Sequence, residues 1–253
     1  MPPSVPSRLT QKLLRRAESR ILRWQGKGYG GSTLADEVQA AAQFIPARGA
    51  VVFDIGANTG EWTRELLRRL PDVAAIHAFE PSRHNWAAID AIGDSRIRLI
   101  KAAVSDREGS AMLYSCAPGS PLASLALRRL DHMGITFDQS EAVATVTLDG
   151  FMARNGIDEI AFAKLDIEGH ELMALQGAAG ALGEQRIRAL AFEFGGCNID
   201  TRTYFRDFWH LLAGYGYHLH RIAPGGRLWP VPAYTESHEC FLITNYLAVC
   251  GAR

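Results

Sequence analysis

The sequence of 253 residues lacks several features that would define a function class at once. It carries no net charge, because 27 lysines and arginines balance 27 acidic residues, whereas a nucleic-acid-binding domain usually has a basic excess. It contains no apolar run close to the ~18 residues of a membrane span. Its four cysteines form no CxxC pair and it has no Asn-x-Ser/Thr acceptor, so a zinc knuckle, a disulfide framework and secretion are not indicated. We therefore expect a reduced, cytoplasmic protein that binds no nucleic acid.

The balanced total charge hides a basic N-terminal segment. Residues 1–28 hold seven basic side chains and one acid, which leaves the remainder with 20 basic and 26 acidic residues. Apolar residues at steps of four, four, four and three define one face of a helix, with most arginines on the other face. These apolar residues are Leu9, Leu13, Ala17, Ile21 and Trp24.

Amphipathic helices usually pack on their own domain, and that is our expectation for this one. The alternatives are peripheral contact with an anionic membrane surface and a targeting segment. We define residues 1–45 as an N-terminal helical extension and residues 46–253 as the main domain. The oligomeric state leaves no trace in the sequence.

The pattern over the main domain alternates between apolar strands and helices. Strands are predicted at residues 51–55, 74–79, 96–101, 160–166 and 187–194, and helices at residues 61–70, 82–92, 170–182 and 201–213. This alternation predicts parallel strands joined by helical crossovers, which is a doubly wound α/β sheet. Residues 217–222 and 240–245 are strand-like with no helix between them, and this predicts an antiparallel pair at the sheet edge.

Residues 110–150 are less regular than the rest of the domain. Strands are predicted at residues 111–115 and 143–148, with a helix ending at Met133 between them. Ser82 and Asp149 each precede a helical stretch and are expected to cap it.

The most informative stretch is Asp54-Ile55-Gly56-Ala57-Asn58-Thr59-Gly60, at the first strand-to-helix turn. In an open α/β sheet, ligands bind beyond the carboxyl ends of the strands. Gly56 and Gly60 allow positive φ and close approach of a ligand, and Asn58 tolerates the left-handed region well. Glu80 ends the second strand, where a carboxylate can accept both hydrogen bonds of a ribose diol. These features predict a nucleoside site, and the alternative is a tight structural turn whose acids cap helices.

The charges of this loop distinguish between nucleosides. A dinucleotide pyrophosphate needs a helix N-terminus free for an anion, and Asp54 and Glu61 would both repel it. A ligand with a cationic, amino-acid-like end suits Asp54 better, and S-adenosylmethionine has an ammonium, a sulfonium and a ribose. The alternatives are a nicotinamide-dependent oxidoreductase and a non-catalytic nucleoside-binding protein on the same fold.

Five motifs extend this pattern across residues 50–248. They are Val52-Phe53-Asp54-Ile55-Gly56-Ala57-Asn58-Thr59-Gly60, Phe79-Glu80-Pro81, Ala103-Val104-Ser105-Asp106, Thr147-Leu148-Asp149 and Lys164-Leu165-Asp166-Ile167-Glu168-Gly169-His170-Glu171. In these motifs the sequence resembles the FkbM-type family of S-adenosylmethionine-dependent methyltransferases. The resemblance implies a Rossmann-like, doubly wound sheet of the class I methyltransferase type, mostly parallel with an antiparallel edge strand. It also implies methyl transfer to a small-molecule or glycan acceptor, mostly at a hydroxyl of a sugar or natural product.

The motifs also give the candidate site residues. The expected cofactor-binding residues are Asp54, Gly56, Ala57, Asn58, Gly60, Glu80, Pro81, Ala103, Val104 and Asp166. The expected catalytic residues are Asp166, Glu168, Lys164 and His170, although His170 departs from the small residue that the family favours.

The prediction of the catalytic residues rests on a charged pair in an apolar strand. Lys164 and Asp166 are two residues apart, so they share a face, and Glu168 lies on the turn beyond. Asp166 is the first candidate to contact both cofactor and acceptor, while Glu168 or His170 could take the acceptor's proton. The alternative is a structural ion pair that fastens the sheet.

A metal centre and an aromatic acceptor pocket are two further alternatives. Asp166, Glu193 and Asn198 could hold a divalent cation through oxygen ligands, but we expect no metal, because the Lys164 ammonium opposes a second cation there. Three aromatic residues could shape an acceptor pocket, with core packing favoured for the first of them. They are Trp209, Trp229 and Tyr234.

Overall fold

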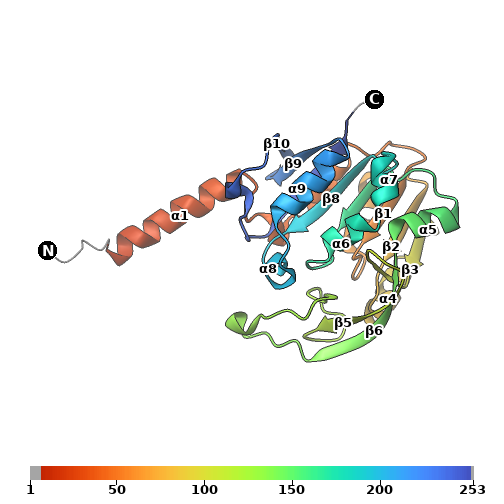
Figure 1. Ribbon diagram of the computed structural model, residues 1–253, viewed down its shortest axis with the longest axis horizontal. Coiled ribbons are helices and arrows are strands. Elements are labelled where there is room, and N and C mark those ends of the chain that lie inside the picture. The colour runs from red at the N-terminus through yellow and green to blue at the C-terminus, as the bar shows by residue number, and fades with distance from the viewer. Residues whose placement is uncertain (1–6, 252–253) are drawn as a thin grey trace.

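A computed structural model describes residues 7–251, and its centre is an eight-stranded sheet in the order β10-β9-β11-β8-β7-β1-β2-β3 (Figure 1). The strands are β1 (Val51–Ile55), β2 (Ala75–Phe79), β3 (Ile97–Ile100), β7 (Phe162–Leu165), β8 (Ala189–Phe194), β9 (Tyr217–Ala223), β10 (Arg227–Val231) and β11 (Thr244–Cys250). Strands β3, β2, β1, β7 and β8 are parallel, and β11, β9 and β10 continue the sheet in antiparallel pairs. This doubly wound, mostly parallel sheet with an antiparallel edge confirms the predicted fold class.

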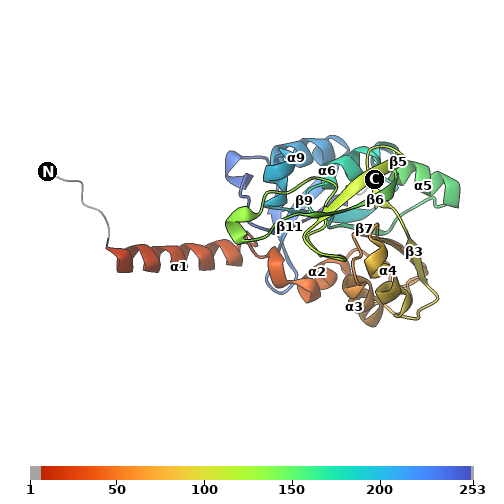
Figure 2. The same ribbon diagram turned by 90° about the horizontal axis from the view of Figure 1, so that it is seen from below.

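Helices cover both faces of the sheet (Figure 2). One face carries α2 (Leu34–Ala41), α3 (Glu61–Arg69) and α4 (Arg83–Asp90), and the other carries α5 (Leu148–Asn155), α6 (Glu171–Gln176), α7 (Ala179–Gly183) and α9 (Phe205–Gly214). Successive residues of β1 alternate between the two cores: Val52 packs in the cluster of Trp62 and Leu66 from α3, whereas Phe53 and Ile55 pack in the cluster on the opposite face. Because both faces are buried, the strand is apolar almost throughout.

The connectivity reverses direction between β1 and β7. From β1 the chain moves outward to β2 and β3, and from β7 it moves the other way to β8. The carboxyl ends of β1 and β7 therefore lie side by side at the switch point, where open α/β sheets bind ligands.

The antiparallel edge contains one more strand than the sequence predicted. Strand β11 begins at Thr244, later than predicted, and is inserted between β8 and β9, while β10 forms the outer edge. The pattern concealed β10 because it contains Pro230 and follows Gly225 and Gly226. Proline is tolerated in such a strand because an edge position needs no donor on its open side.

A small second sheet and a long loop stand over the carboxyl ends of the main strands. The sheet has the order β4-β6-β5 and comprises β4 (Ala103–Val104), β5 (Gly109–Ser115) and β6 (Gln139–Val146). The helix predicted before Met133 is wrong: only a 3₁₀ turn, Asp131–Met133, forms in the β5–β6 loop. This loop is anchored instead by long-range contacts, because Ser124 donates through Oγ to the Glu168 carbonyl oxygen at 2.8 Å and Arg128 pairs with the Glu168 carboxylate.

Three local predictions need correction. The helix predicted over residues 170–182 is divided into α6 and α7 at Gly177, where a Cβ would lie 2.1 Å from the Ser105 carbonyl oxygen. Asp149 does not cap α5, because it accepts from the backbone N–H groups of residues 180 and 181 at the start of α7. Ser82 occupies the N-cap position of α4, but its hydroxyl donates to Glu141 at 2.6 Å instead of capping.

The N-terminal helix α1 (Arg8–Trp24) does not pack on the domain, contrary to our expectation. It has no buried residue and projects away from the sheet in both views (Figures 1 and 2). Contact with the domain begins at its last turn, where the rings of Trp24 and Trp229 lie 6.1 Å apart. Within residues 7–251, no helix combines the length and the apolar composition required to cross a bilayer.

The segment after α1 belongs to the domain. The side chain of Lys27 donates to the Ser237 carbonyl at 2.9 Å, and Gly28 N–H donates to the Thr244 hydroxyl at 3.1 Å. Helix α2 buries Val38, Ala40 and Ala41 in the core shared with β9 and β11. We therefore propose that the extension ends near residue 25 and not at residue 45, because a helix in the core cannot be separated from the domain.

Candidate active site

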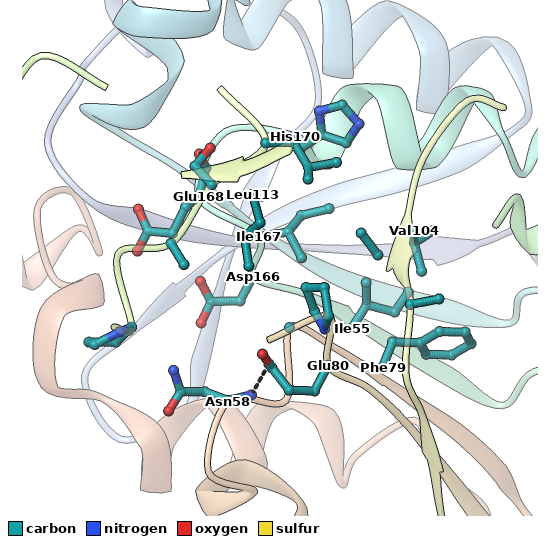
Figure 3. A pocket seen from close by; sticks show the side chains of 18 of the residues that line it. Ile55, Asn58, Phe79, Glu80, Val104, Leu113, Asp166, Ile167, Glu168 and His170 are labelled. Carbon is teal, nitrogen blue, oxygen red and sulfur yellow. Dashed lines mark hydrogen bonds between the residues drawn. The ribbon is translucent and has the colours of Figure 1, made fainter. Parts of the chain in front are cut away.

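A narrow pocket lies at the switch point, above the ends of β1, β2 and β7 (Figure 3). We call it the inner pocket; its empty volume, which includes space open to solvent, is about 550 Å³. It is lined by Ile55, Gly56, Asn58, Phe79, Glu80, Pro81, Ala102, Ala103, Val104, Leu113, Ser120, Pro121, Ala123, Ser124, Leu125, Asp166, Ile167, Glu168 and His170. Most of the expected cofactor-binding residues therefore meet in one place, and the β5–β6 loop forms the pocket's roof.

The glycine turn approaches the β7 end closely. Gly56 has φ +83°, and a Cβ on it would lie 1.9 Å from the carbonyl oxygen of Asp166, so no other residue fits without movement. Asn58 takes φ +48°, which is the left-handed conformation that the sequence suggested for an asparagine there. Gly60, with φ +79°, is the N-cap residue of α3 and does not line the inner pocket.

Glu80 is held by three protein donors. Its Oε2 accepts from Asn58 N–H at 2.8 Å, and its Oε1 accepts from Ser82 N–H at 2.9 Å and from the Asn85 amide at 3.3 Å. A carboxylate has about four acceptor positions, so capacity remains for a hydroxyl donor from the pocket. Burial raises the pKa of Glu80 to about 7, although these hydrogen bonds oppose the rise.

Asp54 does not face the inner pocket, contrary to the sequence-based expectation. Its side chain is fully buried beneath the loop, where Oδ2 accepts from the Thr63 hydroxyl at 2.7 Å and Oδ1 lies 3.7 Å from the Lys164 ammonium. Burial raises the pKa of Asp54, and the Lys164 charge opposes that rise. Asp54 therefore joins β1 to α3 and β7.

Lys164 occupies the centre of a group of carboxylates. Its Nζ lies 3.1 Å from Asp166 and 3.7 Å from Asp54, and Glu37 of α2 adds a third negative charge nearby. Although burial lowers the pKa of Lys164, the carboxylates raise it above its ordinary value, so the ammonium stays charged. The Lys164 ammonium contacts both Asp54 and Asp166, and this arrangement can hold the two carboxylates in place.

Asp166 and Glu168 project to the same side of the inner pocket (Figure 3). Asp166 keeps 39% of its side chain exposed, whereas Glu168 keeps 15% and pairs with Arg128, which also reaches Asp200 at 3.5 Å. Burial and the Asp166 charge raise the pKa of Glu168 to about 8, against the opposing effect of Arg128. Glu168 also takes φ +54°, a strained conformation for a residue with a Cβ, and such strain is frequent at functional sites.

His170 lies apart from these carboxylates. Its ring points away from them, and its Nε2 lies 3.0 Å from the Ser105 hydroxyl (Figure 3). Burial lowers the pKa of His170. It lines the inner pocket.

A second, open hollow joins the inner pocket from the side of α8 (Cys197–Thr201), α2 and the β5–β6 loop. We call it the outer hollow; its empty volume is about 1790 Å³. The walls of both hollows include Gly56, Asn58, Pro121, Asp166 and Glu168. Lys164, Ala57 and Glu193 line the outer hollow and not the inner pocket. The two hollows therefore meet at the Asp166 and Glu168 side chains.

One of the three candidate metal ligands is already engaged within the protein. Asn198 is fully buried, with its Oδ1 accepting from Gly195 N–H and its Nδ2 donating to Thr203, so it has no free ligand atom. Of the residues that the structure describes, the acids and thiol that come within 4.8 Å of one another are Glu168, Glu193 and Cys197. Burial raises the pKa of the Cys197 thiol, which disfavours the thiolate that a metal needs. A metal-free site remains our prediction.

Three features of the site were missed or misplaced by the sequence analysis. Arg128 gave no signal, because it lies in an irregular segment 40 residues from the glutamate that it contacts. Glu171 stands in a quoted motif, yet its role was unseen: it is fully buried and accepts from the N–H groups of Ile167 and Gly169, which fixes the loop after β7. None of the three aromatic candidates for an acceptor pocket, Trp209, Trp229 and Tyr234, lines either hollow.

A glycine turn at the switch point, an acid at the end of β2 and a pocket above both define a doubly wound α/β protein with a ligand site at the carboxyl ends of its strands. The sequence profile of the methyltransferase FkbM domain matches residues 54–219, and the chain belongs to this family. Membership excludes the oxidoreductase alternative and confirms the resemblance seen in the motifs. The methyl donor of the family is S-adenosylmethionine.

Individual relatives are distant. The chain is 27% identical over 152 residues to the 2-O-methyltransferase NoeI of Sinorhizobium fredii, and the match spans 54% of this chain and 60% of NoeI. A solved FkbM methyltransferase from Methylobacillus flagellatus KT is 15% identical, with a TM-score of 0.49 over 94% of this chain and 60% of that one. A putative tRNA (m1A22) methyltransferase of Streptococcus pneumoniae, solved with S-adenosylmethionine, is 12% identical, with a TM-score of 0.42 over 85% of this chain and 72% of that one.

The inner pocket fits the family's cofactor. Glu80 offers acceptor capacity for a ribose diol, and Gly56 removes the Cβ that would block the backbone approach. Phe79, Val104 and Leu113 give an apolar wall for a purine. Asp166 lines the pocket, whereas Asp54 does not, so Asp166 can accept from an ammonium in the role first expected of Asp54.

Proposed function

We propose that the inner pocket binds S-adenosylmethionine, that the outer hollow binds a hydroxyl-bearing acceptor, and that O-methylation takes place where the two hollows meet. The observation that carries this proposal is that Asp166 and Glu168 line both hollows. The bound cofactor supplies an activated methyl group on a sulfonium. Asp166 orients the cofactor's cationic end, and Glu168 accepts the proton that the acceptor hydroxyl loses.

The protonation of Glu168 suits this role. With its pKa raised to about 8, the carboxylate is a stronger base than an exposed glutamate and is still partly ionised near neutral pH. Because the base must be deprotonated, turnover is expected to rise with pH and level off above about pH 8. Arg128 keeps the Glu168 side chain turned toward the junction.

A sugar or a natural product of similar size is the acceptor that we favour. The outer hollow is larger than a single sugar needs, with Arg129 and His132 as hydrogen-bond donors and Trp62 and Phe241 as aromatic surfaces in its wall. The name of the relative NoeI, a 2-O-methyltransferase, supports a hydroxyl as the group methylated. Binding of nucleic acid is not part of this proposal, and neither is a metal.

The test is transfer of labelled methyl groups from S-adenosylmethionine to a panel of glycans and hydroxylated natural products. Glu168→Gln should keep cofactor affinity and lower turnover by about 10²–10⁴-fold, the usual range for a lost general base. Asp166→Asn should weaken cofactor binding as well as turnover. A chelator should leave the rate unchanged. Cofactor binding with no transfer to any acceptor would favour the non-catalytic alternative, and near-normal turnover of Glu168→Gln would move the base elsewhere.

A further inference from the structure

The exposed apolar side chains of this protein gather at two places. Of the thirteen large apolar residues that are exposed within residues 7–251, five lie on α1 and four line the outer hollow. Those on α1 are Leu9, Leu13, Leu14, Ile21 and Trp24, and those of the hollow are Met133, Ile199, Leu242 and Ile243. An apolar surface of this extent, rimmed by charge, is typical of an interaction site.

Helix α1 carries a strongly basic face opposite its apolar one. Between Arg8 and Trp24 there are six basic side chains and one acid, Glu18, which gives a net charge of +5. At 1.5 Å per residue the 17 residues extend for about 25 Å. A helix with low overall hydrophobicity, a wide basic face and Trp and Leu on the other face is the type that lies flat in the interface of an anionic membrane.

The charge of α1 argues against a second copy of this chain as the occupant. Two such helices packed by their apolar faces would bring together ten net positive charges, with only Glu18 of each copy to oppose them. An anionic lipid surface offers the opposite charge and an apolar interior at once. The domain itself leaves the helix uncovered, because contact begins only at Trp24, which meets Trp229.

The outer hollow opens at the base of this helix. Gly30 and Gly31, a few residues after α1, line the hollow, as do Leu242 and Ile243 from the segment before β11. Gly28 N–H donates to the Thr244 hydroxyl, so the C-terminal end of α1 is held beside that segment. A surface that binds α1 therefore lies next to the mouth of the outer hollow.

We propose that α1, together with the apolar rim of the outer hollow, docks this protein on an anionic membrane surface. The apolar residues of α1 enter the headgroup region, the arginines contact lipid phosphates, and the outer hollow opens at the lipid surface. The statement that the outer hollow binds an acceptor rests on the proposed function, whereas the membrane docking does not depend on it.

Co-sedimentation of the full chain with vesicles tests the docking. The chain should bind vesicles of phosphatidylcholine with about 30% phosphatidylglycerol, and bind vesicles of phosphatidylcholine alone at least tenfold more weakly. Raising the salt concentration should release the protein, since the surface potential is screened. Equal binding to both kinds of vesicle, or no binding to either, would overturn the proposal.

Variants of α1 separate the contributions of its two faces. Leu13→Ser with Ile21→Ser keeps the charge and should lower binding at least tenfold, and Arg16→Gln with Arg20→Gln should lower it several-fold. Glu18→Gln is the matched control on the same helix and should lose no binding. Unchanged binding of the Ser variant would refute an apolar contact.

Two further measurements test whether the rim of the outer hollow contacts lipid and whether α1 binds a second copy of the chain. Met133→Ser with Ile199→Ser should weaken vesicle binding if the rim contacts lipid, and unchanged binding would refute its part in the surface. Light scattering of the protein without vesicles should give the mass of a monomer. A dimer that dissociates on the Leu13→Ser substitution would instead show that the apolar face of α1 binds a second copy of the chain. Cofactor affinity of every α1 variant should stay at the wild-type value, so a failure of docking and a failure of the proposed function are distinguishable.

Discussion

Replacing Lys164 tests the charge network beneath the active site. In Lys164→Met the side chain keeps its approximate length, but Asp54, which is fully buried, loses the ammonium 3.7 Å away and retains only the Thr63 hydroxyl. An uncompensated buried charge costs about 3–5 kcal/mol, so Lys164→Met should lower the free energy of unfolding by that amount at pH 8.

Protonation of Asp54 limits this loss and makes it depend on pH. Taking up a proton costs about 1.4 kcal/mol for each pH unit above the group's ordinary pKa of 3.8, hence about 2 kcal/mol at pH 5.5. The sign follows from linkage: the folded-state pKa of Asp54 is raised, and more so without Lys164, so stability is lost as pH rises from about 4 upward. The difference between Lys164→Met and wild type should therefore grow between pH 5.5 and pH 8.

Urea unfolding followed by circular dichroism at both pH values measures this difference, and changes common to both proteins cancel. The control is Lys164→Met with Asp54→Asn, which removes the orphaned charge and should recover more than half of the stability lost at pH 8. A loss below about 1 kcal/mol at pH 8, or one that does not change with pH, would refute the assignment of Asp54 as a carboxylate held by Lys164.

Three further predictions concern the cofactor turn and the N-terminal helix. Glu80→Gln should weaken S-adenosylmethionine binding by about 1.5–3 kcal/mol in calorimetry. Because burial raises the pKa of Glu80 to about 7, wild-type affinity should also rise between pH 6 and pH 8, and the variant's should rise less. Gly56→Ala should abolish cofactor binding and lower the melting temperature, since its Cβ would lie 1.9 Å from a carbonyl oxygen. Gly49→Ala is the control, because Gly49 also has a positive φ but no atom within 4 Å of the added Cβ, so only about 1 kcal/mol of stability should be lost. Deleting residues 1–24 should leave cofactor affinity unchanged, whereas a truncated protein that fails to fold would place α1 in the core.

Local features of the site could be predicted because they depend on neighbouring residues. The turn at Gly56, Asn58 and Gly60 needs backbone conformations that these residue types adopt at low cost, and the structure has them there. Glu80 follows an apolar strand that is adjacent to β1 in the sheet, so its place at the pocket follows from the order of elements alone. The alternation of strands and helices likewise predicted the parallel part of the sheet.

The sequence by itself thus determined the order of the elements, the conformation of the cofactor turn and which carboxylates stand at strand ends. Only the tertiary structure decided which of those carboxylates lines a pocket. Asp54 and Asp166 end adjacent strands, yet one is sealed beneath the loop while the other opens to both hollows. Arg128 reaches Glu168 across 40 residues of chain, and α1 stays uncovered although its pattern is that of a packed helix. These outcomes depend on contacts between distant segments, which periodicity and spacing along one chain do not encode.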